Sequence, residues 1–239
     1  MKNALITGAN KSIGFETARQ LGLQGYHVWL GSRDAERGEA AAARLREEGI
    51  NVRLATMDVT DAESIDAVAQ RIAEQDGKLD LLINNAGILG MASVAPEAQS
   101  LADIMAVYDT NVFGAIRVTQ RFLPLLRGSD AARIVMVSSG LGSLTWVSDT
   151  THPYSQVRAL GYTSSKSALN GVTVAFANAL LTEGISVNAV DPGYTATDFN
   201  GHSGYRTVAQ AVDGIVWLAT QAAQHETGGF YFDRARAPW

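Results

Sequence analysis

The fold is decided by a stretch near the N-terminus, Ala4-Leu5-Ile6-Thr7-Gly8-Ala9-Asn10-Lys11-Ser12-Ile13-Gly14. Its first four residues form an apolar run typical of a buried strand, and Gly8 begins a tight turn. The residues after it, 15–21, have a helical pattern. Strand, glycine turn and helix is the arrangement in which backbone N–H groups at a helix N-terminus hold a pyrophosphate. A plain strand-to-helix turn is the alternative, and this stretch alone does not separate the two.

Strand-like and helix-like segments alternate along the rest of the chain. We expect further strands at 26–31, 51–57, 79–83, 133–137, 185–190 and 229–232. We expect helices at 35–48, from a Thr60/Glu63 capping box to about 75, at 101–126 with a late interruption at Pro124, at 162–183 and at 208–221. This order predicts an α/β fold, a doubly wound parallel sheet (Rossmann fold) of about seven strands with helices on both faces.

No repeat or linker divides the sequence, so we expect one domain over residues 1–239. Residues 141–161 are rich in Ser and Thr and predict an irregular inserted loop.

Composition excludes several classes of function. The formal net charge is -5 and no run of Lys or Arg occurs, which argues against nucleic-acid binding. The absence of cysteine excludes disulfides, thiolate metal sites and a Cys nucleophile. The four histidines are widely spread, so we expect no metal site. No apolar stretch nears the ~20 residues that span a bilayer, and no signal-peptide pattern occurs, so we expect a cytoplasmic protein without a membrane partner.

Several distinctive features come just after a predicted strand ends. In a parallel sheet these positions share one edge, where ligands bind. They are the Gly8 turn, Arg33, Asp58, the Asn85 turn, Ser139 and the Pro192-Gly193 turn. Their convergence predicts a dinucleotide-type site.

Tyr162 and Lys166 are four residues apart on a predicted helix and therefore share a face. A phenol ionises near pKa ~10, and a neighbouring ammonium lowers that pKa. Such a pair can form a tuned general acid. Taken alone the signal is weak, because the same spacing occurs by chance on many exposed helices.

Together these motifs resemble the short-chain dehydrogenase/reductase family, and most closely its carbonyl reductase-like branch. The residues that carry the resemblance are Thr7-Gly8 with Ser12-Ile13-Gly14, Asn84-Asn85-Ala86-Gly87, Asn111, Ser139, Tyr162, Lys166 and the run from Pro192 to Asp198. The resemblance covers nearly the whole chain.

The resemblance implies a role for each catalytic candidate. Tyr162 would protonate the carbonyl oxygen as hydride arrives, and Lys166 would lower the pKa of Tyr162 and hold the nicotinamide ribose. Ser139 would hydrogen-bond the same oxygen, and Asn111 would hold a water in a proton relay. Preorganised donors aimed at a developing charge stabilise the transition state.

The resemblance also implies the cofactor contacts. They are Gly8, Asn10, Lys11, Ser12, Ile13, Gly14, Arg33, Asp58, Val59, Asn85, Ala86, Gly87, Tyr162, Lys166, Pro192, Gly193, Thr195 and Thr197. The threonine hydroxyls would serve a carboxamide or phosphate.

Two departures from the family pattern stand out. Ser12 replaces a glycine, which we expect to affect cofactor affinity modestly. Ser139 and Tyr162 are 23 positions apart, more than in short members of the family, which leaves Ser138 and Ser143 as alternatives to Ser139.

Arg33 at the end of the second strand favours NADP(H), because arginine accommodates a ribose 2′-phosphate where an acidic residue would select NAD. Lys11 adds a second cation. Asp34 argues the other way unless it caps the following helix, and Arg37 is either a third phosphate contact or a surface residue.

The sequence thus favours an NADPH-dependent carbonyl reductase (alcohol dehydrogenase) acting on a small ketone or aldehyde. The alternative is a non-catalytic NADP(H)-binding sensor, while a serine hydrolase lacks its G-x-S-x-G motif. The resemblance leaves a homodimer, a homotetramer and a monomer open. Substrate contacts or ordinary loop packing are both open for the aromatic residues Trp146, Tyr154, Tyr194, Phe199 and Tyr205.

Overall fold

The computed structural model describes residues 1–239 and contains a sheet of eight strands in the order β3-β2-β1-β4-β5-β6-β7-β8. The strands are β1 (Asn3–Ile6), β2 (His27–Ser32), β3 (Val52–Thr56), β4 (Leu81–Asn84), β5 (Arg133–Val137), β6 (Ser186–Asp191), β7 (Phe230–Phe232) and β8 (Ala235–Arg236). The first seven pair in parallel; β8 alone is antiparallel, to β7. The predicted doubly wound parallel sheet is confirmed.

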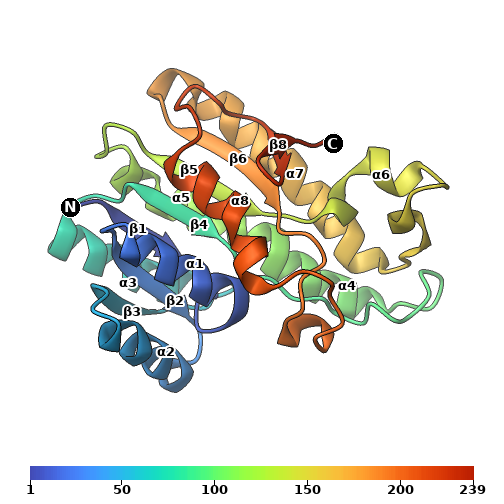
Figure 1. Cartoon of the computed structure of the whole chain (residues 1–239), viewed down its shortest axis with the longest axis horizontal. Coiled ribbons are helices and arrows are strands. Elements are labelled where there is room, and N and C mark those ends of the chain that lie inside the picture. The colour runs from blue at the N-terminus through green and yellow to red at the C-terminus, as the bar shows by residue number, and fades with distance from the viewer.

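Helices cover both faces of this sheet (Figure 1). One face carries α1 (Ser12–Leu23), α2 (Ala35–Glu47) and α8 (Val208–Thr220), and the other carries α3 (Ala62–Asp76), α5 (Ala115–Leu126) and α7 (Leu160–Leu180). Strand residues alternate between the two cores, as their period of two requires. In β1, Ala4 and Ile6 belong to one core and Leu5 to the other.

The eighth strand is absent from the sequence-based prediction of about seven. β8 has only two residues and returns from β7 through Asp233 and Arg234, whose φ angles are 45° and 64°. Tight hairpins with positive φ are usually signalled by Asn-Gly or Asp-Gly. Because Asp-Arg takes that place here, the turn has no recognisable signature.

The predicted single helix over 101–126 is divided. A π-helical segment, Asp109–Gly114, separates α4 (Leu101–Tyr108) from α5, whereas Pro124 lies within α5 without ending it. At Gly114 the backbone approaches the loop after β3 so closely that a Cβ would lie 2.7 Å from Val59 Cγ2. Such π segments often lie at functional sites.

Residues 141–161 are more ordered than predicted. They contain short helical turns at Gly140–Gly142, Leu144–Ser148 (α6) and Pro153–Gln156. The Trp146 ring stacks on His152 at 5.5 Å and lies 6.2 Å from Phe230, which fastens the segment to β7.

Two local predictions about helix starts had opposite outcomes. Thr60 does not cap α3; Asp61 does, accepting a hydrogen bond from the N–H of Glu63 at 3.0 Å. Asp34 does cap α2, accepting from the N–H of Arg37 at 2.9 Å.

Candidate active site

Tyr162 and Lys166 lie on the first turns of α7, which passes the carboxyl end of β5. Lys166 is only 4% exposed, and its Nζ donates a hydrogen bond to the Val137 carbonyl at 2.8 Å. The same ammonium lies 5.6 Å from the centre of the Tyr162 ring. The i,i+4 pair is therefore turned into the protein and not toward solvent.

Ser139 is the serine that meets Tyr162. It follows β5 and its hydroxyl interacts with the phenol. The hydroxyl of Ser138 instead donates to Asn170 Oδ1 at 2.6 Å, and buried Ser143 caps α6. Both alternatives to Ser139 are thus occupied by structural hydrogen bonds.

Asn111 lies in the π-helical segment and is buried, not on the surface. Its side chain accepts from the N–H of Ile88 at 2.8 Å, and donates to the Ile88 carbonyl at 3.0 Å and the Ser165 hydroxyl at 3.1 Å. A Cβ placed on Gly87 would lie 3.3 Å from Asn111 Oδ1 and 3.8 Å from Lys166 Nζ. Asn111 therefore joins the loop after β4 to the helix that carries Tyr162 and Lys166.

The pKa values of the pair move in opposite directions. Burial, the largest effect, raises the pKa of Tyr162 above its ordinary value near 10; the Ser139 hydroxyl opposes this rise and the Asp191 carboxylate adds to it. Burial also lowers the pKa of Lys166 to about 8, while Asp191 works against that shift. The net pKa of Tyr162 is therefore raised and not lowered as the spacing predicts, because desolvation is the largest effect on it.

The glycine turn after β1 is held by the turn after β4. Asn85 donates from its side-chain amide to the carbonyls of Thr7 at 2.9 Å and Gly8 at 3.0 Å. The Thr7 hydroxyl accepts from the N–H groups of Asn85 and Ala86, each at 2.9 Å. A Cβ on Gly14 would lie 2.5 Å from the Gly8 carbonyl oxygen, so only glycine fits where α1 crosses this turn.

The N-terminus of α1 presents free donors beside this turn. Lys11 gives it no side-chain cap, and the N–H groups of Ser12, Ile13 and Gly14 donate to no protein acceptor. Unpaired N–H groups at a helix N-terminus are suited to a phosphate. The residues present therefore fit the pyrophosphate of a dinucleotide.

Sequence comparison places the chain among known proteins. Residues 2–205 match the family model described as short chain dehydrogenase. The chain is 40% identical to the short-chain dehydrogenase anuI of Penicillium roqueforti, over 96% of this chain and 92% of the relative. It is 33% identical to (+)-neomenthol dehydrogenase of Arabidopsis thaliana, over 97% and 95% of the two chains.

This chain belongs to the short-chain dehydrogenase/reductase family. Among solved structures it resembles an NADPH-bound carbonyl reductase from chicken fatty liver, with 28% identity, a TM-score of 0.86 and coverage of 100% and 99%. The resemblance stated from the motifs is confirmed. Members of the family are oxidoreductases that use nicotinamide cofactors, act on small molecules and are often oligomeric.

Several family positions expected to contact the adenosine half of the cofactor lie at the same sheet edge. Arg33 follows β2, is exposed and makes no ion pair or side-chain hydrogen bond. Arg37 is instead held by Asp34, its Nε donating at 2.7 Å. Lys11 pairs with Asp198 at 3.1 Å across the mouth of the site. Of these three cations, Arg33 alone is uncommitted.

Asp58 and Val59 have local partners. The Asp58 carboxylate accepts from the N–H of Thr60 at 2.9 Å and from its hydroxyl at 2.7 Å, and Val59 is buried against Gly114. The side chain of Asn10 is partly exposed and makes no hydrogen bond within the protein.

The hydroxyls of Thr195 and Thr197 are engaged within their own loop. Thr195 donates to the carbonyls of Pro192 and Gly193, and Thr197 forms a capping box with Asn200. Among the five aromatic side chains that the sequence suggests as substrate contacts, Phe199 packs against the Tyr162 ring, with 5.7 Å between the ring centres. Trp146 packs against β7.

Asp191, for which the sequence predicted no role, is buried at the end of β6, between the Ser139 and Pro192-Gly193 turns. A carboxylate ending an otherwise apolar buried strand is a signal that could have revealed it. No group of three or more His, Asp or Glu side chains is arranged to hold a metal ion. None of the helices has the length and apolar character needed to cross a membrane.

Ser12→Gly is predicted to stabilise the protein. Ser12 has a φ of 50°, a left-handed conformation that costs an L-residue about 1–2 kcal/mol, and glycine avoids this at an entropic cost of about 0.5–1 kcal/mol. The free energy of unfolding in urea should rise by about 0.5–1 kcal/mol. Ser12→Ala, which loses the hydroxyl but keeps the strain, is the control; equal stabilisation by both variants would contradict the backbone explanation.

Lys166→Met is predicted to stabilise the protein at neutral pH. The unfolded chain releases the Lys166 proton only near pH 10.5, whereas the folded chain releases it near 8, so burial of the charge costs about 3 kcal/mol below pH 8. Between these values the unfolded state binds more protons, so the stability of the wild type rises with pH and the advantage of the variant shrinks.

Denaturant unfolding from pH 6 to 10 measures this difference, with exposed Lys2→Met as the control for losing a charge. A Lys166→Met protein no more stable than wild type at pH 7 would mean that the hydrogen bond to Val137 offsets the burial cost.

Proposed function

We propose that this chain is an NADPH-dependent reductase that converts a ketone or aldehyde into its alcohol. The observation that carries the proposal is the convergence of Tyr162, Ser139, Lys166 and Asn111 beside the glycine turn. Four side chains from three separate segments meet there, although only Tyr162 and Lys166 are close in sequence. A sensor protein has no need of this combination.

In this proposal a bound nicotinamide supplies the hydride that reaches the carbonyl carbon. Tyr162 donates its phenolic proton to the carbonyl oxygen as negative charge develops there, and Ser139 donates a hydrogen bond to the same oxygen. The product is the alcohol, and the Tyr162 phenolate then regains a proton from solvent. Lys166 stabilises the phenolate by its charge.

The protonation states of the pair are compatible with reduction. The raised pKa of Tyr162 keeps its phenol protonated at neutral pH, so the proton that reduction uses is present. Lys166 loses its proton near pH 8, so we expect reduction to slow as the pH rises through that value. Asn111 would complete the relay of protons through a water near Lys166.

The cofactor preference rests on the end of β2. Arg33 is exposed and unpaired there, and Asp34, which would favour NAD, is used to cap α2 and to bind Arg37. An arginine can pair with a 2′-phosphate and stack on the adenine at once. NADP(H) is therefore the proposed cofactor.

Tyr162→Phe tests the catalytic assignment. The variant should bind NADPH within about twofold of wild type but lose turnover by about 10²–10⁴-fold, the usual contribution of a general acid. The loss of NADPH absorbance with a panel of ketones, aldehydes and quinones measures turnover, and fluorescence titration measures binding. Retained turnover in the variant would reject Tyr162 as the acid.

If the wild type binds NADPH but reduces nothing on a broad panel, the sensor alternative gains support.

Arg33→Ala tests the cofactor assignment. Loss of the guanidinium should raise the Kd for NADPH by about 10- to 100-fold, since a charged hydrogen bond contributes about 1.5–3 kcal/mol, and leave the Kd for NADH nearly unchanged. Arg37→Ala is the matched control, because that arginine is committed to Asp34. An equal loss for both nucleotides would reject the 2′-phosphate role.

A further inference from the structure

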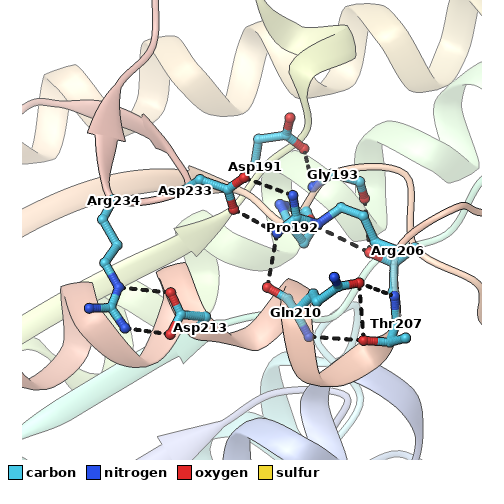
Figure 2. Close-up of polar contacts among 10 residues, drawn as sticks. Asp191, Pro192, Gly193, Arg206, Thr207, Gln210, Asp213, Asp233 and Arg234 are labelled. Carbon is cyan, nitrogen blue, oxygen red and sulfur yellow. Dashed lines mark hydrogen bonds and ion pairs between the residues drawn. The ribbon is translucent and has the colours of Figure 1, made fainter.

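Asp191 is a buried carboxylate to which the proposed reaction assigns no part. It is 4% exposed and ends β6. Its Oδ1 accepts a hydrogen bond from the N–H of Gly193 at 2.8 Å, whereas Oδ2 is buried and has no hydrogen-bond partner (Figure 2). Burial raises the pKa of Asp191, with the N–H groups of Gly193 and Gly140 opposing.

No cation neutralises this carboxylate directly. Arg206, whose charge acts on Asp191, is committed to Asp233 through two hydrogen bonds, at 2.8 and 2.6 Å, and donates a third to the Gln210 carbonyl (Figure 2). An isolated buried charge costs several kcal/mol. A turn-forming role alone would not require it, because an asparagine oxygen could accept from Gly193 equally well.

The position of Oδ2 shows which part of the backbone the Asp191 carboxylate faces. A Cβ on Gly140 would lie 2.8 Å from that oxygen, so the carboxylate faces the backbone of the residue after Ser139. Gly193 is equally crowded on its other side, where a Cβ would lie 2.5 Å from Arg206 Cδ. The lack of a side chain at Gly140 therefore lets its turn approach Asp191, and the lack of one at Gly193 lets that turn approach Arg206.

We propose that Asp191 is a positioning residue: one carboxylate holds the turn that carries Ser139 against the Pro192-Gly193 turn. The proposal rests on the proposed reductase function, in which Ser139 polarises the substrate carbonyl. By fixing the backbone after Ser139, Asp191 keeps that hydroxyl against the phenol of Tyr162. Its negative charge also acts on Tyr162 and Lys166 and favours their protonated forms.

The Asp191→Asn variant tests whether the carboxylate holds both turns or only the Pro192-Gly193 turn. The amide keeps one acceptor oxygen, but its NH₂ group must face either Gly140 or Gly193, both of which present N–H donors. Only one turn can then be held. Asp213→Asn is the matched control, because that half-exposed carboxylate on α8 binds only Arg234, in the turn between β7 and β8 (Figure 2).

The first measurement is kinetic, with NADPH and the panel carbonyl that wild type reduces fastest. Asp191→Asn should lower kcat by about 10- to 100-fold, as expected for a misplaced donor, and change the Kd for NADPH by less than about threefold. Ser139→Ala/Asp191→Asn should be no slower than Ser139→Ala alone. Additive losses, or an Asp191→Asn variant with wild-type kcat, would overturn the proposal.

The pH profile gives a second readout that a purely structural role would not change. Titratable groups facing Asp191 are Tyr154, Tyr162, Lys166, Arg206 and Asp233. Removing its charge should move the alkaline limb of kcat/KM toward lower pH, because Lys166 and Tyr162 lose a group that favours their protonated forms. An unmoved limb contradicts the electrostatic part.

A third readout needs no turnover, so it separates failure of this proposal from failure of the reductase function. In ¹⁵N–¹H spectra of the whole chain, Asp191→Asn should shift the amide resonances of both Gly140 and Gly193 and leave Gly171, on the far part of α7, in place. An unchanged Gly140 resonance would show that the bridge does not exist. Asp191→Ser, which can reach only Gly193, should reproduce the kinetic loss if Asp191→Asn folds poorly.

Discussion

Burial of the Lys166 ammonium is the constraint on which the site depends. Water is replaced there by a single carbonyl, that of Val137, and by the π face of Tyr162. A charge in such a place requires the surrounding backbone to be fixed, and the structure fixes it from several directions. Asn111 bonds Ser165 on the helix of Lys166, and Asn170 donates to the Gly142 carbonyl at 3.1 Å. Burial of this charge lowers the stability of the fold, and titratable groups perturbed in this way are common at functional sites.

The fold was largely predictable from sequence because apolar runs and glycine turns are local signals. β5 is found at the predicted residues, and β1 and β6 within one or two residues of them. The π-helical segment was not predictable from local signals, and its last residue, Gly114, lies against Val59, a contact between distant segments. β8 was not predicted because two residues are too few to show the alternating pattern of a strand.

The candidate site divides in the same way. Tyr162 and Lys166 share a face because of their spacing, which the sequence contains. The choice of Ser139 over Ser138 and Ser143 depends on which hydroxyls the fold uses elsewhere, and sequence is silent about that. The direction of the Tyr162 pKa was mispredicted for a related reason: spacing reveals the neighbouring charge but not the loss of water.

The three titratable side chains at the site, Tyr162, Lys166 and Asp191, influence one another's protonation. Burial alone moves both titrating side chains toward their neutral forms, which are protonated for Tyr162 and deprotonated for Lys166. Asp191 favours the protonated form of both, so it supports desolvation at the phenol and opposes it at the ammonium. With Asp191 in place, a protonated phenol and a protonated ammonium lie side by side near neutral pH. The reduction that we propose uses this state, because the phenol can donate a proton and the ammonium can stabilise the phenolate that remains.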